Sequence, residues 1–409
     1  MTNVAEIRNL FPVLSRKVHG KGLVYFDNAA TSQRPQSVID EWNRITSFSN
    51  GNIHRAVHAL ADEATNAYEA ARDSVKEFLN AASREEIVFT SGATAAINLV
   101  AFSFGEAFIS QGDEVIVSEA EHHSNIVPWQ MMCHRKGAVL KVLPVDDSGH
   151  LVVDQLENLI TAKTKIVAVT HISNVLGIIN PIDNIIEISH SRGVPVLIDG
   201  AQGVVHCKVD VQKLDCDFYV FSGHKLYAAT GTGVLYGKKK WLDLMPPYMG
   251  GGEMVGTVSF AETTYAPLPM KFEAGTQNFS STATLKPAIS ILNLLNDNDL
   301  IEENNAVRDY LSRFFTEDSR IKLYGVPRGT NEEKIPLFSF TVEGVHHEDL
   351  ALILDKMGIA VRSGQMCAEP LMDRFGVTGM LRISLAPYNT MQEAEYFVKC
   401  LNRAIDMLI

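Results

Sequence analysis

The sequence predicts an α/β protein: a large domain built on a mainly parallel sheet, followed by a smaller α+β domain. Two patterns carry this prediction. Between about residues 85 and 237, short apolar runs alternate with segments of helical period, which is typical of a layered α/β domain. Beyond about residue 285, long helical segments separated by single strand-like runs replace that alternation. We therefore expect an N-terminal segment at 1–20, a large domain at 21–285 and a small domain at 286–409.

Six apolar runs supply the expected strands of the large domain. They are rich in β-branched and aromatic residues and are bounded by polar or glycine-containing segments. The runs are EIVFT (86–90), DEVIVS (113–118), KIVAVTHIS (165–173), VPVLID (194–199), DFYVFS (217–222) and GVLYG (233–237). One connection between them is predicted to be a helix, because Pro181 opens the segment 182–192 at its first turn and Gly193 closes it.

The C-terminal region is organised differently. We expect helices over 289–315 and 348–358, with a strand over 335–344 between them. A final amphipathic helix ends the chain, and Thr390 and Glu393 have the spacing of a capping box at its start. This order of elements predicts the α+β character of the small domain.

Composition excludes several classes of protein. The chain has 36 basic and 48 acidic residues, a net charge of -12, and no basic block of the kind that contacts nucleic acid. Its N-terminus lacks the basic start and continuous apolar core of a signal peptide, and no apolar run approaches the ~20 residues that cross a bilayer. The five cysteines are scattered without a CxxC pair, so we expect neither a disulfide framework nor a metal site. These features predict a cytoplasmic protein without nucleic-acid or membrane partners.

Polar residues follow the predicted strands at the point where each strand ends. In a parallel α/β sheet these ends meet at one edge, which is where ligands bind. The residues concerned are Ser91, Gly92, Ala93 and Thr94 after the first run, His122 and His123 after the second, Asn174 after the third, and Gly200, Ala201 and Gln202 after the fourth. The turn at Gly92 suits an anion, because helix N-terminal amides converge there, although alone such a turn is more often an ordinary N-cap.

Two charged residues also end apolar runs. Asp199 ends VPVLID and needs a cation or hydrogen-bond donors, either in a binding site or in a structural salt bridge. Lys225 follows DFYVFS, and a partly desolvated lysine has a lowered pKa, which makes it the amine needed for a Schiff base. Taken singly, it is equally a surface lysine or a phosphate contact. The glycines after it do not form a nucleotide-binding loop, since the order GxxxxGK[ST] is absent.

One cofactor accounts for these residues together. Pyridoxal 5'-phosphate needs a lysine for its aldehyde, an acid for its pyridinium nitrogen, donors for its phosphate and often a ring that stacks on it. Lys225, Asp199, the Thr94 turn with Ser222 and His224, and His122 supply these in turn. The combination predicts a pyridoxal-phosphate site at the sheet edge.

Ten stretches of the sequence resemble a known family, the aminotransferase class V group, and within it the SufS-type (group II) cysteine desulfurases. The matching stretches are YFDNAAT (25–31), GNIHRAVHALADEAT (51–65), FTSGATAAINLVA (89–101), EAEHHSNIVPWQ (119–130), THISNVLG (170–177), LIDGAQ (197–202), DCDFYVFSGHK (215–225), GGGEM (250–254), FEAGTQN (272–278) and VRSGQMCAEP (361–370). They run from about residue 24 to near the C-terminus, almost the whole chain. The resemblance implies the fold-type I architecture of pyridoxal-phosphate enzymes.

The resemblance assigns roles to single residues of the cofactor site. It implies that Lys225 forms the Schiff base, that Asp199 pairs with the pyridine nitrogen, that Gln202 bonds the ring hydroxyl and that His122 stacks on the ring. Thr94, Ser222 and His224 are expected to hold the phosphate, with Thr276 reaching in from the second subunit of a homodimer.

The resemblance also implies a set of substrate-side residues: His54, Asn174, Arg362 and Arg382. Arg382 is expected to grip the carboxylate of an amino acid as a bidentate fork. An interface salt bridge is the alternative for either arginine, and it is less favoured for Arg382 than for Arg362.

Cys367 differs from the other cysteines, because it lies in the small, polar stretch SGQMCAEP and is expected on an exposed loop, where a thiolate acts as nucleophile. The implied reaction converts L-cysteine to L-alanine and leaves a persulfide on Cys367. A SufE- or SufU-type acceptor then collects the sulfur for iron-sulfur cluster assembly. The alternatives are a selenocysteine lyase, with L-selenocysteine as substrate, a cysteine sulfinate desulfinase, or a non-catalytic scaffold for cluster-assembly partners.

The sequence departs from the family pattern at two places. Gln365 and Met366 stand where the branch often has two histidines before the cysteine. Ala228 and Ala229 stand where the family usually shows Gly-Pro after the lysine. The first departure leaves no imidazole before the cysteine to handle a proton, and the second is expected to alter the turn without touching the chemistry. Neither overturns the family assignment.

Overall fold

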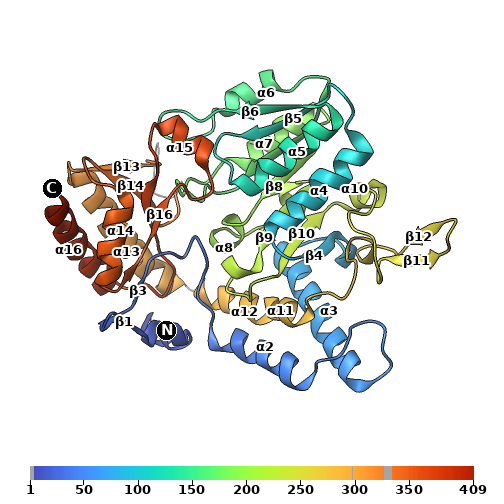
Figure 1. Cartoon of the computed structure of the whole chain (residues 1–409), viewed down its shortest axis with the longest axis horizontal. Helices are drawn as coiled ribbons and strands as arrows, with labels where there is room; N and C mark the ends of the chain where they lie inside the picture. The colour runs from blue at the N-terminus through green and yellow to red at the C-terminus, as the bar shows by residue number, and fades with distance from the viewer. Residues whose placement is uncertain (1–3, 297, 327–333) are drawn as a thin grey trace.

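A seven-stranded sheet forms the centre of the large part of the molecule (Figure 1). The computed structural model describes residues 4–296, 298–326 and 334–409. In spatial order the strands are β4 (Ile87–Thr90), β10 (Gly233–Gly237), β9 (Phe218–Ser222), β8 (Val196–Asp199), β7 (Thr164–Thr170), β5 (Glu114–Ser118) and β6 (Val139–Leu143). The six predicted strands are present, and the prediction of a mainly parallel sheet is confirmed: only β10 runs against its neighbours β4 and β9. No α-helix separates β9 from β10; the connection 223–232, which contains only the 3-10 helix Gly223–Lys225, returns the chain antiparallel.

The seventh strand, β6, escaped the sequence analysis because it lies at the edge of the sheet. Val139 and Val142 are about half exposed, and Lys141 interrupts the apolar run between them. An edge strand covered on one side only does not need the continuous apolar run by which a buried strand is recognised.

Helices cover both faces of the sheet, and alternate residues of each strand point to opposite faces. Leu197 of β8 and Val220 of β9 belong to the apolar cluster beneath α4 (Ala93–Phe108) and α5 (Val127–Lys136). Ile198 and Phe221, one position further along each strand, belong to the cluster on the other face, which includes residues of α3 (Ala59–Leu79), α7 (Ile182–Ser191) and α12 (Leu285–Leu295). Burying one such side chain stabilises the fold by about 1.5–3 kcal/mol, so a one-residue slip of a strand is strongly disfavoured.

The remaining helices of the large part are short or lie at its lower edge. They are α2 (Gln36–Phe48), α6 (Leu156–Leu159), α8 (Gly203–His206), α9 (Val211–Leu214), α10 (Lys239–Leu244) and α11 (Phe279–Ala283). A hairpin of β11 (Val255–Val258) and β12 (Thr263–Tyr265) projects from the body at the side opposite the C-terminal helices (Figure 1). Pro181 precedes α7 as its N-cap residue, one position earlier than predicted.

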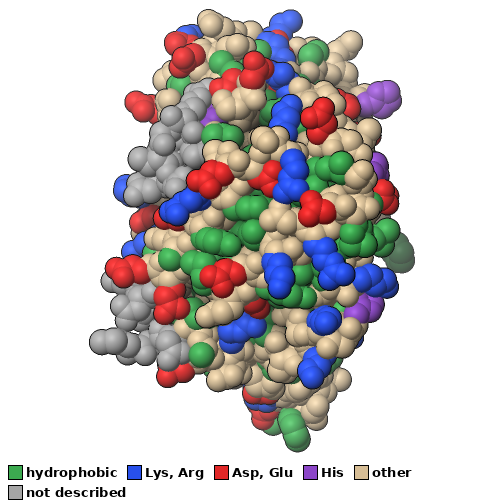
Figure 2. All heavy atoms as spheres, turned by 90° about the vertical axis from the view of Figure 1, so that its left-hand side faces the viewer, with side chains coloured by type: hydrophobic (Ala, Val, Ile, Leu, Met, Phe, Trp, Pro, Cys, Tyr) green, Lys and Arg blue, Asp and Glu red, His purple; other side chains and the backbone are tan. Residues whose placement is uncertain are grey.

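The C-terminal part is built on a four-stranded antiparallel sheet. Its strands, in order, are β13 (Ile321–Tyr324), β14 (Leu337–Val342), β17 (Met380–Ser384) and β16 (Arg362–Gly364), and its helices are α13 (Asn298–Glu317), α14 (His347–Lys356), α15 (Glu369–Phe375) and α16 (Met391–Leu408). The predicted capping box is confirmed: Glu393 N–H donates to Thr390 Oγ1 at 3.2 Å, and Thr390 N–H to Glu393 Oε2 at 3.0 Å. On the face that carries the C-terminal helices, acidic and basic side chains are interspersed (Figure 2).

The N-terminal segment contacts the C-terminal part as well as the large sheet. After α1 (Val4–Asn9), β1 (Lys17–Val18) and β2 (Lys21–Gly22), strand β3 (Val24–Tyr25) pairs in parallel with β15 (Ile359–Ala360). Ser384 N–H donates to Phe26 O at 2.7 Å, so the segment continues along the end of β17. The domain boundaries at 20 and 285 remain a prediction, and this pairing links the two predicted domains across them.

Candidate active site

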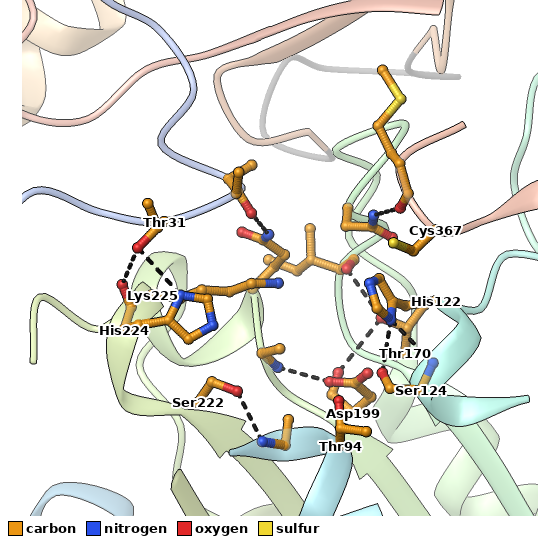
Figure 3. Close-up of a pocket in the computed structure, with 18 of the residues that line it drawn as sticks. Thr31, Thr94, His122, Ser124, Thr170, Asp199, Ser222, His224, Lys225 and Cys367 are labelled. Atoms are coloured by element: carbon orange, nitrogen blue, oxygen red, sulfur yellow. Dashed lines mark hydrogen bonds between the residues drawn. The ribbon is translucent and has the colours of Figure 1, made fainter. Parts of the chain in front are cut away.

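A cavity of about 430 Å³ opens at the carboxyl edge of the seven-stranded sheet, between that sheet, the N-terminal segment and strands β16 and β17 (Figure 3). All of the predicted site residues except His54 and Thr276 line it. They are Thr94, His122, Asn174, Asp199, Gln202, Ser222, His224, Lys225, Arg362, Cys367 and Arg382. The cavity therefore brings together residues from strand ends, a helix start and a loop that are far apart in sequence.

Asp199 and Lys225 come from neighbouring parallel strands and face the same space. Asp199 ends β8 and is 4% exposed, with Ala201 N–H donating to its Oδ1 at 3.0 Å. Burial raises the pKa of Asp199, while this hydrogen bond and the charge of Lys225 oppose the rise. Burial lowers the pKa of Lys225 to about 8, with Asp199 opposing and Arg382 reinforcing the shift. At pH 7 roughly a tenth of the amine is therefore neutral, far more than for a lysine of ordinary pKa.

The start of helix α4 forms the end of the cavity that suits an anion. Ala93 N–H donates to Ser222 Oγ at 2.8 Å, which joins the helix start to the end of β9, and Thr94 lines the cavity beside it. Gly92 has φ +154°, and a Cβ on Gly233 of β10 would lie 2.4 Å from Gly92 Cα. The glycines at 92 and 233 are therefore needed for close approach of two backbones, and they bring helix-end amides to the cavity wall.

His224 is held by the N-terminal segment. Thr31 Oγ1 and Ser32 Oγ both donate to His224 O at 3.1 Å, and Thr31 Oγ1 lies 3.2 Å from the ring Nδ1. Burial lowers the pKa of His224 to about 4, with the charges of Lys225 and Arg34 adding to the effect. The ring is neutral at physiological pH and can bind an anion through a hydrogen bond rather than through charge.

His122 presents a neutral ring of fixed tautomer. Ser124 N–H donates to His122 Nδ1 at 3.1 Å, so Nδ1 carries no proton and the proton lies on Nε2. Burial lowers the pKa of His122 to about 4, reinforced by Lys225, His123 and Arg382. A neutral imidazole can stack on an electron-poor ring without the repulsion that an imidazolium would bring.

Glu121 supports this ring, although the sequence analysis missed it. Its buried carboxyl accepts from Asn125 Nδ2 at 2.6 Å and from Thr170 N–H at 2.8 Å, and it also bonds the Ser118 hydroxyl. Burial raises the pKa of Glu121 to about 8, against the three hydrogen bonds. These bonds fix the 121–125 turn against β7. The signal in the sequence was the acidic residue directly before the two histidines.

The substrate side of the cavity is formed by strands of the C-terminal sheet. Arg382 is 2% exposed; its Nη1 donates to Asn174 O at 2.7 Å and its Nη2 to Asp27 Oδ1 at 3.1 Å, while Nε is buried without a partner. Arg362 stands directly opposite Arg382 across the strand pair and is exposed. The ion pair of Arg382 is thus made within the chain, and Asp27 is a second residue that the sequence analysis missed.

Cys367 lies on a loop at the mouth of the cavity, residues 365–367, which we call the thiol loop. Met366 and Cys367 have φ values of +51° and +56°, a backbone region uncommon for residues other than glycine. Cys367 is exposed, whereas Cys133, Cys216 and Cys400 are buried and Cys207 is partly so. Burial raises the pKa of Cys133 and of Cys207 to about 11. Of the five thiols, Cys367 has the access that a nucleophile requires.

His54 and Thr276 lie outside the cavity of their own chain. His54 Nε2 contacts Glu69 Oε1 at 3.2 Å, and Thr276 is exposed. A buried ion pair connects the segments that carry them: Arg72 Nη1 donates to Glu273 Oε1 at 2.8 Å, and Arg72 Nε to Glu69 Oε2 at 3.1 Å. His54 is thus bonded to this network and Thr276 follows its Glu273 in the chain, so both lie away from the other predicted site residues.

Ala228 and Ala229 follow the lysine in a buried turn. Tyr227 has φ +63°, and Ala228 N–H donates to Gly223 O at 3.0 Å, which closes the turn. Ala229 N–H donates to Thr284 Oγ1 at 3.0 Å, a bond that proline at this position lacks the hydrogen to make. The two alanines that depart from the family pattern are therefore held by hydrogen bonds of this chain's own turn.

Two other kinds of feature are absent from the described residues 4–296, 298–326 and 334–409. No group of three or more His, Cys, Asp or Glu side chains is arranged to hold a metal ion there. Nor does that part of the chain contain a helix with the length and apolar character needed to cross a bilayer.

An amine, a buried carboxylate, a helix start and a neutral imidazole around one cavity are the groups that pyridoxal phosphate requires, so fold and site define an α/β pyridoxal-phosphate enzyme. The family model for aminotransferase class-V matches residues 24–397, and the chain belongs to this family. This confirms the predicted family and, through it, the cofactor.

Individual relatives match along the whole chain. A probable cysteine desulfurase of Vibrio cholerae is 44% identical over 408 residues, which cover 100% of both chains. A cysteine desulfurase of Synechococcus elongatus is also 44% identical, over 98% of this chain, but the match covers 63% of that longer relative. The crystal structure of the Escherichia coli cysteine desulfurase CsdA, in its S-sulfonic acid form, has a TM-score of 0.91 at 40% identity and covers 100% of both chains. The predicted fold is confirmed.

Proposed function

We propose that this chain is a pyridoxal-phosphate-dependent cysteine desulfurase, a sulfurtransferase that converts L-cysteine to L-alanine and keeps the sulfur as a persulfide on Cys367. One observation carries the proposal: a lysine with a depressed pKa and an exposed cysteine line the same cavity. The names of the full-length relatives support the same activity.

The cofactor wall, by which we mean Thr94, His122, Asp199, Ser222 and Lys225, fits this cofactor. Lys225 would hold its aldehyde carbon, Asp199 its ring nitrogen, the α4 start with Ser222 and His224 its phosphate, and Gln202 its ring hydroxyl. Bound there, the cofactor supplies an electron-poor ring that withdraws electron density from the α-carbon of the substrate. Asp199 is buried among few hydrogen-bond donors. A protonated ring nitrogen of the cofactor would therefore stabilise the charge of its carboxylate.

The protein's own side chains carry out the other steps. Arg382 binds the carboxylate of L-cysteine, and its unpartnered Nε is a donor available for this. Lys225, with its pKa near 8, moves the proton at the substrate Cα. The Cys367 thiolate attacks the substrate sulfur: an S–S bond forms, the Cβ–S bond breaks, and its electron pair stays on Cβ, which takes a proton to give L-alanine.

The test uses purified holoenzyme and two substrates. With L-cysteine and a thiol reductant, we expect equal amounts of alanine and sulfide. Cys367→Ala abolishes alanine formation from L-cysteine and spares L-selenocysteine, whose selenium leaves without a protein thiol. Equal turnover of L-cysteine by the variant contradicts the persulfide step and favours a selenocysteine lyase or sulfinate desulfinase. A colourless protein that takes up no pyridoxal phosphate favours a non-catalytic scaffold.

We further propose that two copies of the chain form a homodimer that shares its sites, with His54 and Thr276 completing the partner's cavity. Their distance from the cavity of their own chain supports this. Mixing a Lys225→Ala variant with a His54→Ala, Thr276→Ala variant tests it. If sites are shared, the mixed dimer holds one intact site and regains activity, up to about half of wild type in each mixed dimer. No recovery despite mixed-dimer formation contradicts sharing.

The exposed Cys367 also supports transfer to a second protein. We expect an acceptor of the SufE or SufU type, acting in iron-sulfur cluster assembly in the cytoplasm. Adding a candidate acceptor is expected to raise the rate of alanine release without a reductant, and radioactive sulfur from L-cysteine to appear on the acceptor. An acceptor that leaves both quantities unchanged is not the partner.

A further inference from the structure

We propose that His123 is a positioning residue that holds the thiol loop in place by capping helix α15. This rests on the proposed function only in treating Cys367 as the reacting thiol. His123 makes two contacts with the segment that carries Cys367. Its backbone N–H donates to Cys367 O at 2.7 Å, and its ring Nε2 accepts from Glu369 N–H at 3.0 Å. The two contacts lie on either side of Ala368, so they hold both ends of the turn from the loop into the helix.

Helix α15 lacks a cap of its own. Its N-cap residue, Ala368, has no side-chain oxygen, and its second residue is Pro370, which carries no N–H. The first N–H groups of a helix have no partner inside the helix and need an acceptor from elsewhere. The imidazole of His123, 246 residues away in sequence, supplies that acceptor to Glu369.

The thiol loop needs external support because its backbone is unfavourable. Met366 and Cys367 are consecutive residues with positive φ, and neither is glycine. Such a conformation persists only where the surroundings impose it. Asn174 Nδ2 provides one support through Met366 O at 2.8 Å, and His123 provides the two on the other side of the thiol.

The 121–125 turn contacts both the cofactor side of the cavity and the thiol loop. His122 lines the cavity, and its neighbour His123 holds the thiol loop. Glu121, directly before them, fixes the turn to β7 through Thr170 N–H. A displacement of the 121–125 turn therefore moves His122 and the Cys367 thiol together. The distance between the thiol and the cofactor wall is kept constant in this way.

The test compares two side chains that carry the same amide. Glutamine places its Oε1 near the position of His123 Nε2, whereas asparagine is one methylene shorter and does not reach Glu369 N–H. In His123→Asn, we expect the Glu369 amide to exchange hydrogen at least about tenfold faster in the holoenzyme. His123→Gln is expected to restore protection to within about threefold of wild type. Unchanged protection in His123→Asn, or equal loss in both variants, overturns the proposal.

Kinetics provide a second readout that simple destabilisation does not produce. His123→Asn is expected to lower kcat for L-cysteine about tenfold or more, because a small misplacement of a reacting group is costly. KM for L-cysteine, the cofactor absorbance and the turnover of L-selenocysteine are expected to stay within twofold of wild type. A parallel loss with both substrates overturns the proposal. If no desulfurase activity exists at all, the exchange experiment still decides the role of His123, so the two failures are distinguishable.

Discussion

The cofactor wall and the thiol loop face each other across one cavity, yet they are built in opposite ways. The wall consists of residues at strand ends and a helix start: Asp199 and Ser222 are buried and held by the ladder of the central sheet, while His122 and Lys225 are partly buried and Thr94 is exposed. The loop exposes Gln365 and Cys367 and buries Met366, has two residues of positive φ, and is held by side chains from distant segments. The contrast teaches that the group requiring a fixed geometry lies on the sheet, while the group that must receive and release sulfur lies where a second protein can reach it.

The largest predicted effect distinguishes the cofactor wall from the thiol loop by the substrates that each one needs. Lys225→Ala is expected to lower turnover of both L-cysteine and L-selenocysteine by more than about 10³-fold, since both need the amine. Cys367→Ala is expected to remove only the first activity. Alanine formation from each substrate measures both, with Lys213→Ala as a control lysine on the surface. Loss of both activities in Cys367→Ala would place the thiol in the machinery of the cofactor wall.

The second prediction compares the two arginines of the substrate side. Arg382→Lys removes the planar fork of a buried guanidinium and is expected to reduce kcat/KM for L-cysteine about 100-fold. Arg362→Lys changes an exposed cation and is expected to raise KM about three- to tenfold with kcat unchanged. Steady-state kinetics measure both. Equal effects would mean that the substrate carboxylate is shared between the two side chains.

The third prediction concerns the turn that both regions use. Glu121→Ala leaves the donors of Asn125 and Thr170 buried without an acceptor, and we expect the free energy of unfolding to fall by about 2–3 kcal/mol. Chemical denaturation measures it. Glu157→Ala, which removes an exposed partner of Arg192, is the control and is expected to stay within about 0.5 kcal/mol. A loss no larger than the control's would show that the 121–125 turn does not depend on this carboxyl.

The smallest predicted effect is a pH dependence of stability that comes from His224, which lines the cavity beside the cofactor wall. The pKa of His224 is lowered to about 4 in the folded chain, so between about pH 4 and 6.5 the unfolded chain binds more protons. Stability contributed by the neutral ring is therefore present above pH 6.5 and lost as pH falls to 4. We expect wild type to lose about 1–2 kcal/mol more than His224→Asn over this range, measured by denaturation at each pH. Parallel curves would contradict the depressed pKa.

Much of the fold and of the cofactor wall could be predicted from the sequence because both depend on local patterns. Apolar runs mark buried strands, and parallel strands bring Asp199 and Lys225 to one edge whatever lies between them. Edge strand β6 lacked the apolar run. Glu121, Asp27 and His123 were not assigned roles because these arise only from contacts with Thr170, Arg382 and Glu369, residues remote in sequence. For His54 and Thr276, which lie outside the cavity of their own chain, no pattern within the chain tests the roles that the resemblance implies.

The pairing of β3 with β15 orders events during synthesis of the chain. The strands of the central sheet are complete once residue 237 has emerged, whereas the hydrogen bond from Asn28 Nδ2 to Ser384 O joins residues 356 positions apart and forms only after Ser384 is made. Because N-terminal parts of a nascent chain fold first, the lysine and its carboxylate can be in place before Cys367 has been translated. Cys367 then enters a molecule whose cofactor wall already exists, and the cavity is completed when β3 pairs with β15 and Asp27 forms its bridge to Ser384 at the end of β17.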